Sequence, residues 1–305
     1  MPLVHINFAE LNNEFKSGFV SIIGMPNAGK STLYNALMGD NLAIVNPKAQ
    51  TTRHRILGIK TTNDYQIIFS DTPGILKNLS YKMHETMMRI VNESLEDSDV
   101  LILMCDVSRP EIPEDIQNRF NQFSGKKIFC LNKIDISDQQ KVEEAMLLWK
   151  QKIAADLYFA ISASNKFNLE ILERSVIEFL PEHSPYFDSE DITDRSERFF
   201  VNEMVRNNIL NLYSEEIPYS CEVVTMSFKE AEKIIRISCE IIVERESQKK
   251  IVIGTKGAAI KQLGISSRKQ LEEFFQKQVY LELFVKIREN WRNNPNMLRQ
   301  FGYDE

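Results

Sequence analysis

The 305-residue sequence lacks the features that mark several protein classes. With only 11 glycines and 10 prolines, it is neither collagen-like nor of low complexity. No apolar run approaches the ~18 residues that cross a bilayer, so we expect no transmembrane segment. Residues 1–16 show no basic stretch followed by an apolar one, and we therefore expect no signal peptide. These absences favour a globular protein of the cytoplasm.

Cysteine is scarce as well. The four cysteines are far apart in the chain and show no paired metal-binding spacing; they are Cys105, Cys130, Cys221 and Cys239. Three of them lie in apolar runs typical of β-strands. We therefore expect buried thiols in a reducing compartment.

Charge is distributed unevenly along the chain. The formal net charge of −6 argues against nucleic-acid binding by the chain as a whole. Residues 229–305 nevertheless carry 15 Lys and Arg against 11 Asp and Glu, a net charge of +4, which leaves −10 for residues 1–228. Within 245–269 there are seven basic residues and a single acid. This division suggests two modules with different partners.

The first 180 residues alternate between apolar, strand-like runs and helical patterns. Such an alternation is typical of a mostly parallel sheet with helices on both faces, the α/β class. We expect strands over 18–24, 54–60, 65–70, 99–106, 127–131 and 157–162. We expect helices from residue 30 and over 81–97, 138–152 and 168–180. In the last helix, apolar residues recur on one face at positions 169, 172, 176 and 180.

The pattern changes at residue 181. Residues 181–196 are polar and acidic with two prolines, which predicts an exposed linker. Beyond the linker we expect helices over 197–213, 247–253 and 258–278, and strands over 219–228, 233–245 and 279–287. The resulting order, α-β-β-α-α-β, describes a compact α+β module. We place the first domain, the linker and the second domain at 1–181, 182–196 and 197–305.

Residues 24–31 fit the phosphate-binding pattern G-x-x-x-x-G-K-[ST] and lie between an expected strand and an expected helix, as that pattern requires. Small residues let backbone N–H groups converge on phosphate oxygens, and the helix N-terminus adds its positive end. Lys30 can reach the β- and γ-phosphates, and the Ser31 hydroxyl can bind Mg²⁺. The predicted nucleotide contacts are Gly24, Met25, Pro26, Asn27, Ala28, Gly29, Lys30, Ser31 and Thr32.

A second phosphate element is expected after the strand over 65–70. Asp71 follows that strand, where its carboxylate can hold Mg²⁺ through water. Thr72 and Pro73 continue the motif, and Gly74 leaves its backbone N–H free to approach a γ-phosphate. Downstream of a phosphate-binding loop, D-T-P-G predicts a phosphate sensor rather than a simple turn.

Two short motifs predict recognition of guanine. In N-K-I-D, a buried Asp135 carboxylate can accept hydrogen bonds from N1–H and the 2-amino group of the base. Adenine lacks that amino donor and would leave the carboxylate unpaired. In S-A-S at 162–164, a backbone N–H can meet guanine O6. The predicted base contacts are Asn132, Lys133, Asp135, Ser162 and Ala163, which makes GTP or GDP the expected ligand.

The G-T-K-G loop at 254–257 predicts nucleic-acid binding by the second module. Such a loop between two helices lets the chain pass close to a nucleic-acid backbone, where N–H groups and a lysine contact phosphates. Basic neighbours add a salt-dependent contribution, and an apolar groove that includes Ile251 can hold unstacked bases. The predicted contacts are Lys249, Lys250, Ile253, Gly254, Thr255, Lys256, Gly257, Ile260, Lys261 and Arg268, flanked by Lys269.

In this order the motifs resemble those of the translation-factor-related GTPases, and in detail those of the Era GTPases of bacteria. The resemblance to the Era GTPases rests on P-N-x-G-K-S-T of the phosphate loop and on Q-T-T-R-H at 50–54. The resemblance continues through V-I-G-x-x-G-x-x-I at 252–260, Y-L-E-L-x-V-K at 280–286 and the F-G-Y ending. It therefore covers most of the chain.

The resemblance implies a P-loop GTPase domain joined to a type II KH domain. It implies that either Thr51 or Thr52, in the first switch, supplies a hydroxyl to Mg²⁺, and the sequence does not decide which. It also implies binding near the 3′ end of small-subunit ribosomal RNA and a role in assembly of the 30S subunit. Peripheral association with the inner membrane face is implied too, and we expect a monomer.

The expected reaction is in-line attack of water on the γ-phosphate of GTP. Many small GTPases place a water-orienting glutamine just after D-x-x-G, but Ile75 stands there and has no hydrogen-bonding group. We therefore expect slow intrinsic hydrolysis, completed either by K⁺ bound with help from Asn27 or by the ribosome or RNA. We expect His54 and His84 to be solvated and not to act as bases. The residues assigned to catalysis are Lys30, Thr51, Thr52 and Gly74.

Segments 40–55 and 74–85 are expected to respond to the γ-phosphate and Mg²⁺. Because both modules share one chain, nucleotide and RNA should alter each other's affinity. An alternative is a non-enzymatic RNA-binding scaffold with a structural nucleotide, which Ile75 favours. The single set of GTPase motifs and the missing C-terminal cysteine motif disfavour a tandem GTPase and a tRNA-modification GTPase.

Overall fold

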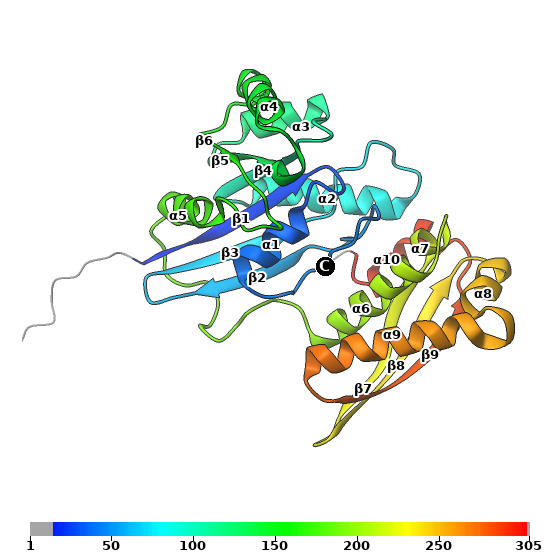
Figure 1. Ribbon diagram of the computed structural model, residues 1–305. Helices are drawn as coiled ribbons and strands as arrows, with labels where there is room; N and C mark the ends of the chain where they lie inside the picture. The colour runs from blue at the N-terminus through cyan, green and yellow to red at the C-terminus, as the bar shows by residue number, and fades with distance from the viewer. Residues whose placement is uncertain (1–14, 304–305) are drawn as a thin grey trace, which may run out of the picture.

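The structure is a computed structural model that describes residues 15–303. The expectation that residues 1–16 contain no signal peptide falls almost entirely outside this range. The ends of the two expected domains, 1–14 and 304–305, also lie outside the described residues. Two β-sheets, each with its own helices, make up the two parts of the molecule (Figure 1).

In the described part of the chain, the first sheet has six strands in the order β2-β3-β1-β4-β5-β6. The strands are β1 (Lys16–Gly24), β2 (Ile56–Thr61), β3 (Tyr65–Asp71), β4 (Val100–Asp106), β5 (Lys126–Asn132) and β6 (Leu157–Ala160). β2 is antiparallel to β3, and the other neighbours are parallel, which confirms the mostly parallel sheet. β4 is buried along its whole length because helices cover both faces of the sheet.

Among residues 15–303, five helices accompany this sheet: α1 (Lys30–Met38), α2 (Lys82–Glu96), α3 (Glu114–Gln122), α4 (Gln139–Lys152) and α5 (Leu169–Phe179). On one face, α1 and α5 bury side chains such as Leu33 and Leu172. On the other face, α2, α3 and α4 bury Val91, Phe120 and Trp149. Four of these helices match the expected ones, whereas α3 was not predicted.

The parallel strands present their carboxyl ends at one edge of the sheet. Gly24, Asp71, Asp106 and Asn132 are the last residues of β1, β3, β4 and β5. The loops that follow therefore converge, which is where an open α/β sheet binds its ligand. This arrangement brings the separately predicted motifs to one place.

The expected linker is mostly exposed, but the first sheet holds it in place. The backbone N–H of Ile59, in edge strand β2, donates to Ile192 O over 3.0 Å. The Gln66 side chain accepts from the backbone N–H of Tyr186 over 2.7 Å and donates to Phe187 O over 2.9 Å. The segment thus follows the sheet edge to the second part of the molecule.

The second sheet has the order β7-β8-β9, with β7 (Glu222–Glu230) antiparallel to β8 (Ile234–Val243) and β8 parallel to β9 (Gln278–Ile287). Its helices are α6 (Glu197–Leu212), α7 (Ile217–Ser220), α8 (Glu246–Ile253), α9 (Ala258–Phe275) and α10 (Pro295–Gln300). α6 and α9 pack together on one face. The expected α-β-β-α-α-β order is confirmed, and the short α7 and α10 are additions that were not predicted.

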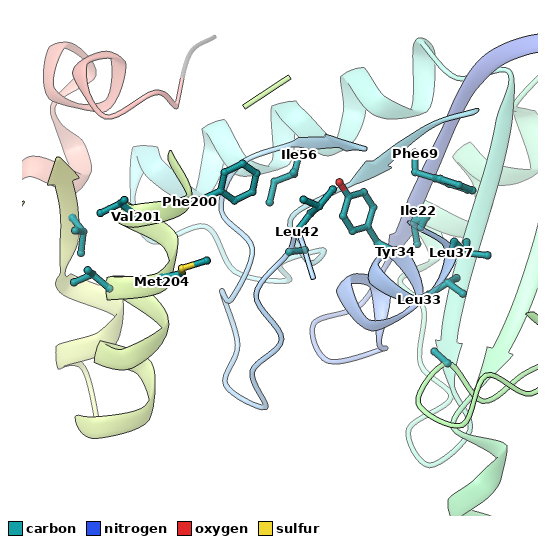
Figure 2. Close-up of a cluster of buried hydrophobic side chains, with 14 of the residues drawn as sticks. Ile22, Leu33, Tyr34, Leu37, Leu42, Ile56, Phe69, Phe200, Val201 and Met204 are labelled. Carbon is teal, nitrogen blue, oxygen red and sulfur yellow. The ribbon is translucent and has the colours of Figure 1, made fainter. Parts of the chain in front are cut away.

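The two parts share a continuous hydrophobic core. Ile56 of the first part lies next to Phe200 of α6, and Leu42 and Met204 belong to the same buried cluster (Figure 2). A separate cluster joins Met83 and Met87 of α2 to buried side chains of the C-terminal segment, Trp291, Leu298 and Tyr303. The second part therefore packs directly against the elements that surround the candidate site.

Candidate functional site

The loop between β1 and α1 has the tight geometry that phosphate binding requires. Gly29, just before α1, has φ 97°, and a Cβ there would lie 2.3 Å from Nδ2 of Asn132. A Cβ on Gly24 would lie 2.5 Å from the carbonyl oxygen of Met104. Only glycine fits either position, so the loop can remain close to both neighbouring strand ends.

Lys30 is buried at the start of α1, with 6% of its surface exposed. Its Nζ donates to the carbonyl oxygens of Gly24 over 3.2 Å and Met25 over 3.1 Å. Burial lowers the pKa of Lys30 to about 8, against the opposing effect of the Asp71 carboxylate. An anion beside this ammonium group would favour its charged form.

Three oxygen-bearing side chains meet next to Lys30. The Ser31 hydroxyl donates to Asp71 Oδ2 over 2.7 Å, and Thr52 Oγ1 lies 3.0 Å from Ser31 Oγ and 3.1 Å from Asp71 Oδ2. The second carboxylate oxygen, Asp71 Oδ1, is buried and has no hydrogen-bond partner among residues 15–303. Burial raises the pKa of Asp71, while Lys30 and the two hydroxyls oppose that rise. This set of oxygens fits a hard cation such as Mg²⁺.

The structure separates the two threonines between which the sequence left a choice. Thr52 is the one beside Ser31 and Asp71. The hydroxyl of Thr51 points elsewhere and donates to the carbonyl oxygen of Lys48 over 2.6 Å. Of the two, only Thr52 has its hydroxyl among the candidate Mg²⁺ ligands.

The D-T-P-G segment packs against the phosphate loop. The Thr72 hydroxyl donates to Ile22 O over 2.7 Å, and Pro73 is buried. A Cβ on Gly74 would lie 2.9 Å from Cα of Pro26, so glycine permits this close approach. The side chain of Ile75 is 3% exposed and packs in the core with Leu103. Ile75 therefore cannot orient water, because its side chain has no hydrogen-bonding group and lies in the core.

The N-K-I-D and S-A-S segments meet at the end of β5. The Nδ2 group of Asn132 donates to Ala28 O over 2.8 Å, and Asn132 Oδ1 accepts from Ala163 N over 3.0 Å. Ser162 is buried beside Ala163. The carboxylate of Asp135 is exposed, so the expectation of a buried carboxylate was wrong. Asp135 lies in a 3₁₀ turn over Ile134–Ile136, which projects beyond the strand end.

Lys133 has a partner that the sequence analysis missed. Its Nζ lies 2.6 Å from Asp106 Oδ2, and Asp106 Oδ1 accepts from the Ser108 hydroxyl over 2.7 Å. These hydrogen bonds lower the pKa of Asp106 although its partial burial acts in the opposite direction. An acid as the last residue of a buried strand, the same signal that identified Asp71, would have indicated Asp106.

A cavity of about 860 Å³ connects these groups. It is lined by the phosphate loop from Met25 to Thr32, by most of residues 44–52, by Gly74, by most of residues 105–111 and by Lys133. Asn27, at φ 64°, lies on its rim and donates to the carbonyl oxygen of Pro47 over 2.8 Å. Of the predicted nucleotide contacts, Met25 to Thr32, Gly74 and Lys133 line the cavity. The others do not line it; they are Gly24, Asp71, Thr72, Pro73, Asn132, Asp135, Ser162 and Ala163.

Both histidines that we expected to be solvated are buried. His54 is 6% exposed, with Nδ1 3.1 Å from Gly302 O and its ring beside Tyr303. His84 is 7% exposed, and its Nδ1 accepts from the backbone N–H of Ser80 over 3.2 Å. For His54 the expectation failed because the residues against its ring, Phe199 and Tyr303, are far away in the chain. Neither side chain lines the candidate cavity.

The G-T-K-G loop lies between α8 and α9 and requires left-handed backbone. Gly254, Lys256 and Gly257 have φ 74°, 51° and 78°. The side chains of Thr255 and most of the predicted basic contacts are exposed, whereas Lys249 is half-buried. The exposed basic residues are Lys250, Lys256, Lys261, Arg268 and Lys269. The end of α8, the loop and α9 as far as Lys269 thus carry the exposed basic side chains.

A smaller cavity of about 340 Å³ lies between α9 and β9. Its lining includes Ile260, Ile265, Leu281 and Leu283, with Lys261 and Arg268 at its side. An apolar groove beside the loop is therefore present and contains Ile260 as expected. Ile251 and Ile253 do not line it: Ile251 faces solvent, and Ile253 packs against the core.

The remaining expectations from composition concern thiols and membranes. All four cysteines are buried and unpaired, and burial raises the pKa of each thiol, which confirms the assignment as core residues. Within residues 15–303, no helix combines the length and apolar character of a membrane span. That range also contains no cluster of three or more His, Cys, Asp or Glu arranged for a metal ion.

Comparison with known proteins agrees with this geometry. The family described as 50S ribosome-binding GTPase matches residues 19–133, and the KH domain family matches residues 216–292. GTPase Era of Syntrophus aciditrophicus is 42% identical over 95% of this chain and 96% of its own length. GTPase Era of Caldanaerobacter subterraneus is 41% identical over 95% of this chain and 98% of its own length.

Solved structures give the same match. The crystal structure of Era in complex with MgGDPNP and nucleotides 1506–1542 of 16S ribosomal RNA has a TM-score of 0.89 and 38% identity. A variant of Aquifex aeolicus Era bound to GDP and AlF₄⁻ gives the same two values. Each alignment covers 95% of this chain and 99% of the other.

Proposed function

The chain belongs to the Era family of GTPases, and from this premise we propose that it links GTP binding and hydrolysis to the binding of small-subunit ribosomal RNA. The observation that carries the proposal is the group of Ser31, Thr52 and Asp71 oxygens within 3.1 Å of one another beside Lys30. The same chain presents an exposed basic G-x-x-G loop. The related Era crystallised with MgGDPNP and 16S ribosomal RNA supports both ligands.

We assign triphosphate binding to the loop over 24–32. Its backbone N–H groups and the N-terminus of α1 would surround the phosphates, and Lys30 would exchange its two carbonyl partners for phosphate oxygens. Ser31, Thr52 and Asp71 would hold Mg²⁺, with Asp71 acting through water. Bound there, Mg²⁺ supplies positive charge to the β- and γ-phosphates. Gly74 would bring its N–H to the γ-phosphate.

The placement of the attacking water needs a group other than residue 75, because Ile75 is in the core. We propose K⁺ near Asn27 as the first option, supported by the contact between the Asn27 amide and Pro47 on the cavity rim. RNA or the 30S subunit is the second. Either option predicts slow hydrolysis by the isolated chain.

Guanine selection is assigned to the two motifs at the end of β5 and after β6. Asp135 would accept from the N1–H and 2-amino groups, and bound guanine would cover this exposed carboxylate. Asn132 fixes the N–H of Ala163 and the loop carbonyl of Ala28, so it would position the site without contacting the base itself. Lys133, paired with Asp106, would lie along the nucleotide.

RNA binding is assigned to the G-T-K-G loop and α9. Exposed Lys250, Lys256, Lys261 and Arg268 would contact phosphates, and Lys249 and Thr255 lie beside them. The two loop glycines would let the nucleic-acid backbone come close to the protein backbone. The groove between α9 and β9, which Ile260 lines, would hold unstacked bases. The cavity beside basic side chains supports single-stranded RNA as the ligand.

The domain boundaries we propose are 1–181 for the GTPase domain, 182–196 for the linker and 197–305 for the KH domain with its C-terminal tail. The end of α5 at Phe179 and the start of α6 at Glu197 support them. A role in 30S assembly, a cytoplasmic location with peripheral contact to the inner membrane, and a monomeric state rest on membership of the family.

Measurement of phosphate release from GTP tests the enzymatic part of the proposal. Release would be measured with and without 30S subunits, in K⁺ and in Na⁺. We expect slow release by the isolated chain and faster release with K⁺ or with 30S subunits. No release under any of these conditions would favour the alternative, an RNA-binding scaffold whose nucleotide is structural.

Crosslinking to total RNA tests the RNA-binding part. We expect recovery of the 3′ region of small-subunit ribosomal RNA, with recovery reduced by substitution of Gly254 or Gly257. Coupling between the domains is tested by RNA affinity in the GTP and GDP forms. Equal affinity in the two forms would refute coupling.

A further inference from the structure

The segment between α1 and β2 is held by the second domain. Residues 39–55 contain no helix or strand, yet they carry Thr52 of the candidate Mg²⁺ site. A connection of this length without regular structure is costly to order unless other elements hold it. Here α6 lies alongside it: Leu42 of the segment belongs to the same buried cluster as Met204 of α6, and Ile56, the residue that follows the segment, lies close to Phe200 (Figure 2).

Arg206 of α6 contacts the backbone of the two residues that precede Thr52. The side chain is 1% exposed. One terminal nitrogen, Nη1, donates to Gln50 O over 3.2 Å, and the other, Nη2, donates to Thr51 O. Nε donates to Glu203 Oε1 over 2.7 Å, and Nη2 also contacts Glu203 Oε2. Glu203 thereby neutralises the buried guanidinium and fixes its direction.

The carbonyl oxygen of Thr51 belongs to the peptide group that connects Thr51 to Thr52. Holding that oxygen fixes the peptide plane from which the Thr52 side chain projects. The Thr52 hydroxyl is then 3.0 Å from Ser31 Oγ and 3.1 Å from Asp71 Oδ2. A short path of bonded and hydrogen-bonded atoms therefore connects the KH domain to the candidate Mg²⁺ ligands.

Neighbouring contacts hold the same segment from the same helix. The Asn46 amide donates to the side-chain oxygens of Asn207 over 2.9 Å and Asn211 over 2.7 Å. Lys48 Nζ donates to the carbonyl oxygens of Leu210 and Tyr213 at the end of α6. These contacts anchor residues 46–48, whereas Arg206 alone among them reaches the backbone next to Thr52.

We propose that Arg206 is a positioning residue for Mg²⁺-dependent GTP hydrolysis, supplied by the KH domain to hold Thr52 in the GTPase site. This inference rests on the proposed GTPase function. Arginine suits the task because its planar fork can serve two backbone carbonyls and a carboxylate at once, which a lysine cannot. Nucleotide affinity in the absence of Mg²⁺ depends on other residues and should not require Arg206.

Two variants test the role of Arg206. Arg206→Lys keeps a buried positive charge opposite Glu203 but loses the fork, and Glu203→Gln with Arg206→Met removes the ion pair without leaving a buried charge alone. Arg198→Met is the matched control, because Arg198 is an exposed arginine of the same helix. Single-turnover phosphate release would be measured against Mg²⁺ concentration, alongside GDP affinity in EDTA and the melting temperature.

Loss of a charge-assisted hydrogen bond to the segment should raise the Mg²⁺ concentration for half-maximal release about tenfold and slow release by a similar factor. We expect GDP affinity in EDTA to stay at the wild-type value, and the control to behave as wild type. Hydrogen exchange of amides in residues 46–54 should become faster. The Mg²⁺ dependence separates a positioning role from a merely structural one.

Wild-type Mg²⁺ dependence and release rate in both variants would overturn the inference, whether or not their melting temperatures fall. This result is distinct from failure of the proposed function. In that case the wild-type chain itself would bind no GDP in EDTA or release no phosphate, and its variants would give no further information about the GTPase.

Discussion

The side chain of Asn132 donates a hydrogen bond to the carbonyl oxygen of Ala28 over 2.8 Å. The same amide accepts a hydrogen bond from the backbone N–H of Ala163 over 3.0 Å. Asn132 is 2% exposed. One buried amide thus connects the phosphate loop with the S-A-S segment, and the distance between the two ends of the nucleotide site is fixed before a ligand binds.

Replacing Asn132 with alanine should weaken the whole site. The change leaves the Ala28 carbonyl and the Ala163 N–H without their partner, at a cost of about 1 to 3 kcal/mol for each buried group. We expect a lower melting temperature and at least about tenfold weaker GDP binding by calorimetry. Asn165→Ala, at an exposed position three residues beyond Ser162, should change neither. Unaltered GDP affinity in Asn132→Ala would contradict the connecting role.

Replacing Asp135 with asparagine should change which base is preferred. Xanthine carries a carbonyl where guanine has its 2-amino group, so an amide can pair with xanthine while the carboxylate pairs with guanine. We expect GDP affinity to fall by about 100-fold or more and xanthosine diphosphate affinity to rise. Competition binding with both nucleotides measures this. Asp138→Asn, which alters the helix cap three residues away, is the control for lost charge, and an unchanged guanine preference would refute the assignment to Asp135.

The sequence alone predicted most of the first sheet because its strands are strongly apolar. The strand over 99–106, for example, is β4, whose seven residues are all buried. The phosphate and base motifs were placed by the same logic, since each follows a strand-like apolar run of the sequence. The helix over Glu114–Gln122 was missed because only Ile116 and Phe120 of its residues are buried, a pattern too sparse to show helical periodicity.

What the sequence could not predict is contact between the domains. Arg53 and His54 lie in a polar stretch that predicts a solvated loop. Arg53 is nevertheless fully buried and bonds to Cys221 O over 2.9 Å and to Glu222, 169 residues away. Hydropathy and spacing describe near neighbours in the chain, so they give no signal for such burial. The same reason hid the role of Arg206.

The two glycines of the G-T-K-G loop should differ in a measurable way. A Cβ on Gly254 would lie 2.6 Å from Cβ of Ala259, whereas a Cβ on Gly257 meets nothing within 4 Å. Gly257→Ala should therefore lower the free energy of unfolding only by the strain of its left-handed backbone, about 1 to 2 kcal/mol. Gly254→Ala should lower it by more. Chemical denaturation of the chain would show this order.

Both variants should bind RNA more weakly, for different reasons. A methyl group on Gly257 extends into open space where a nucleic-acid backbone would approach, whereas a methyl group on Gly254 meets Ala259 and displaces the loop. We expect Gly257→Ala to lose RNA affinity with little loss of stability, measured by titration with an RNA of the small-subunit 3′ end. Gly39→Ala is the matched control, because Gly39 ends α1 with the same φ of 78° and a Cβ there also meets nothing within 4 Å. Full RNA affinity in Gly257→Ala would place the RNA elsewhere on the domain.

His84 should make the stability of the protein depend on pH. Burial and the positive charges of Arg53 and Arg292 lower the pKa of His84 below its ordinary value of 6.5. Its Nδ1 also accepts a hydrogen bond from Ser80 N, which protonation of that atom would break. As pH falls below 6.5, the unfolded chain takes up a proton on His84 before the folded chain does. The stability that neutral His84 contributes is therefore present above pH 6.5 and is lost as the pH falls.

The comparison of wild type with His84→Gln isolates this effect, because glutamine can still accept from Ser80 without titrating. Melting temperatures would be measured at pH 7.5 and pH 5.5 for both proteins. We expect the fall in melting temperature on acidification to be greater for wild type, by on the order of 1 to 2 °C. Other groups titrate in both proteins, so their effects on the melting temperature cancel when the two falls are compared. An equal fall in the two proteins would show that His84 is protonated as readily when folded as when unfolded.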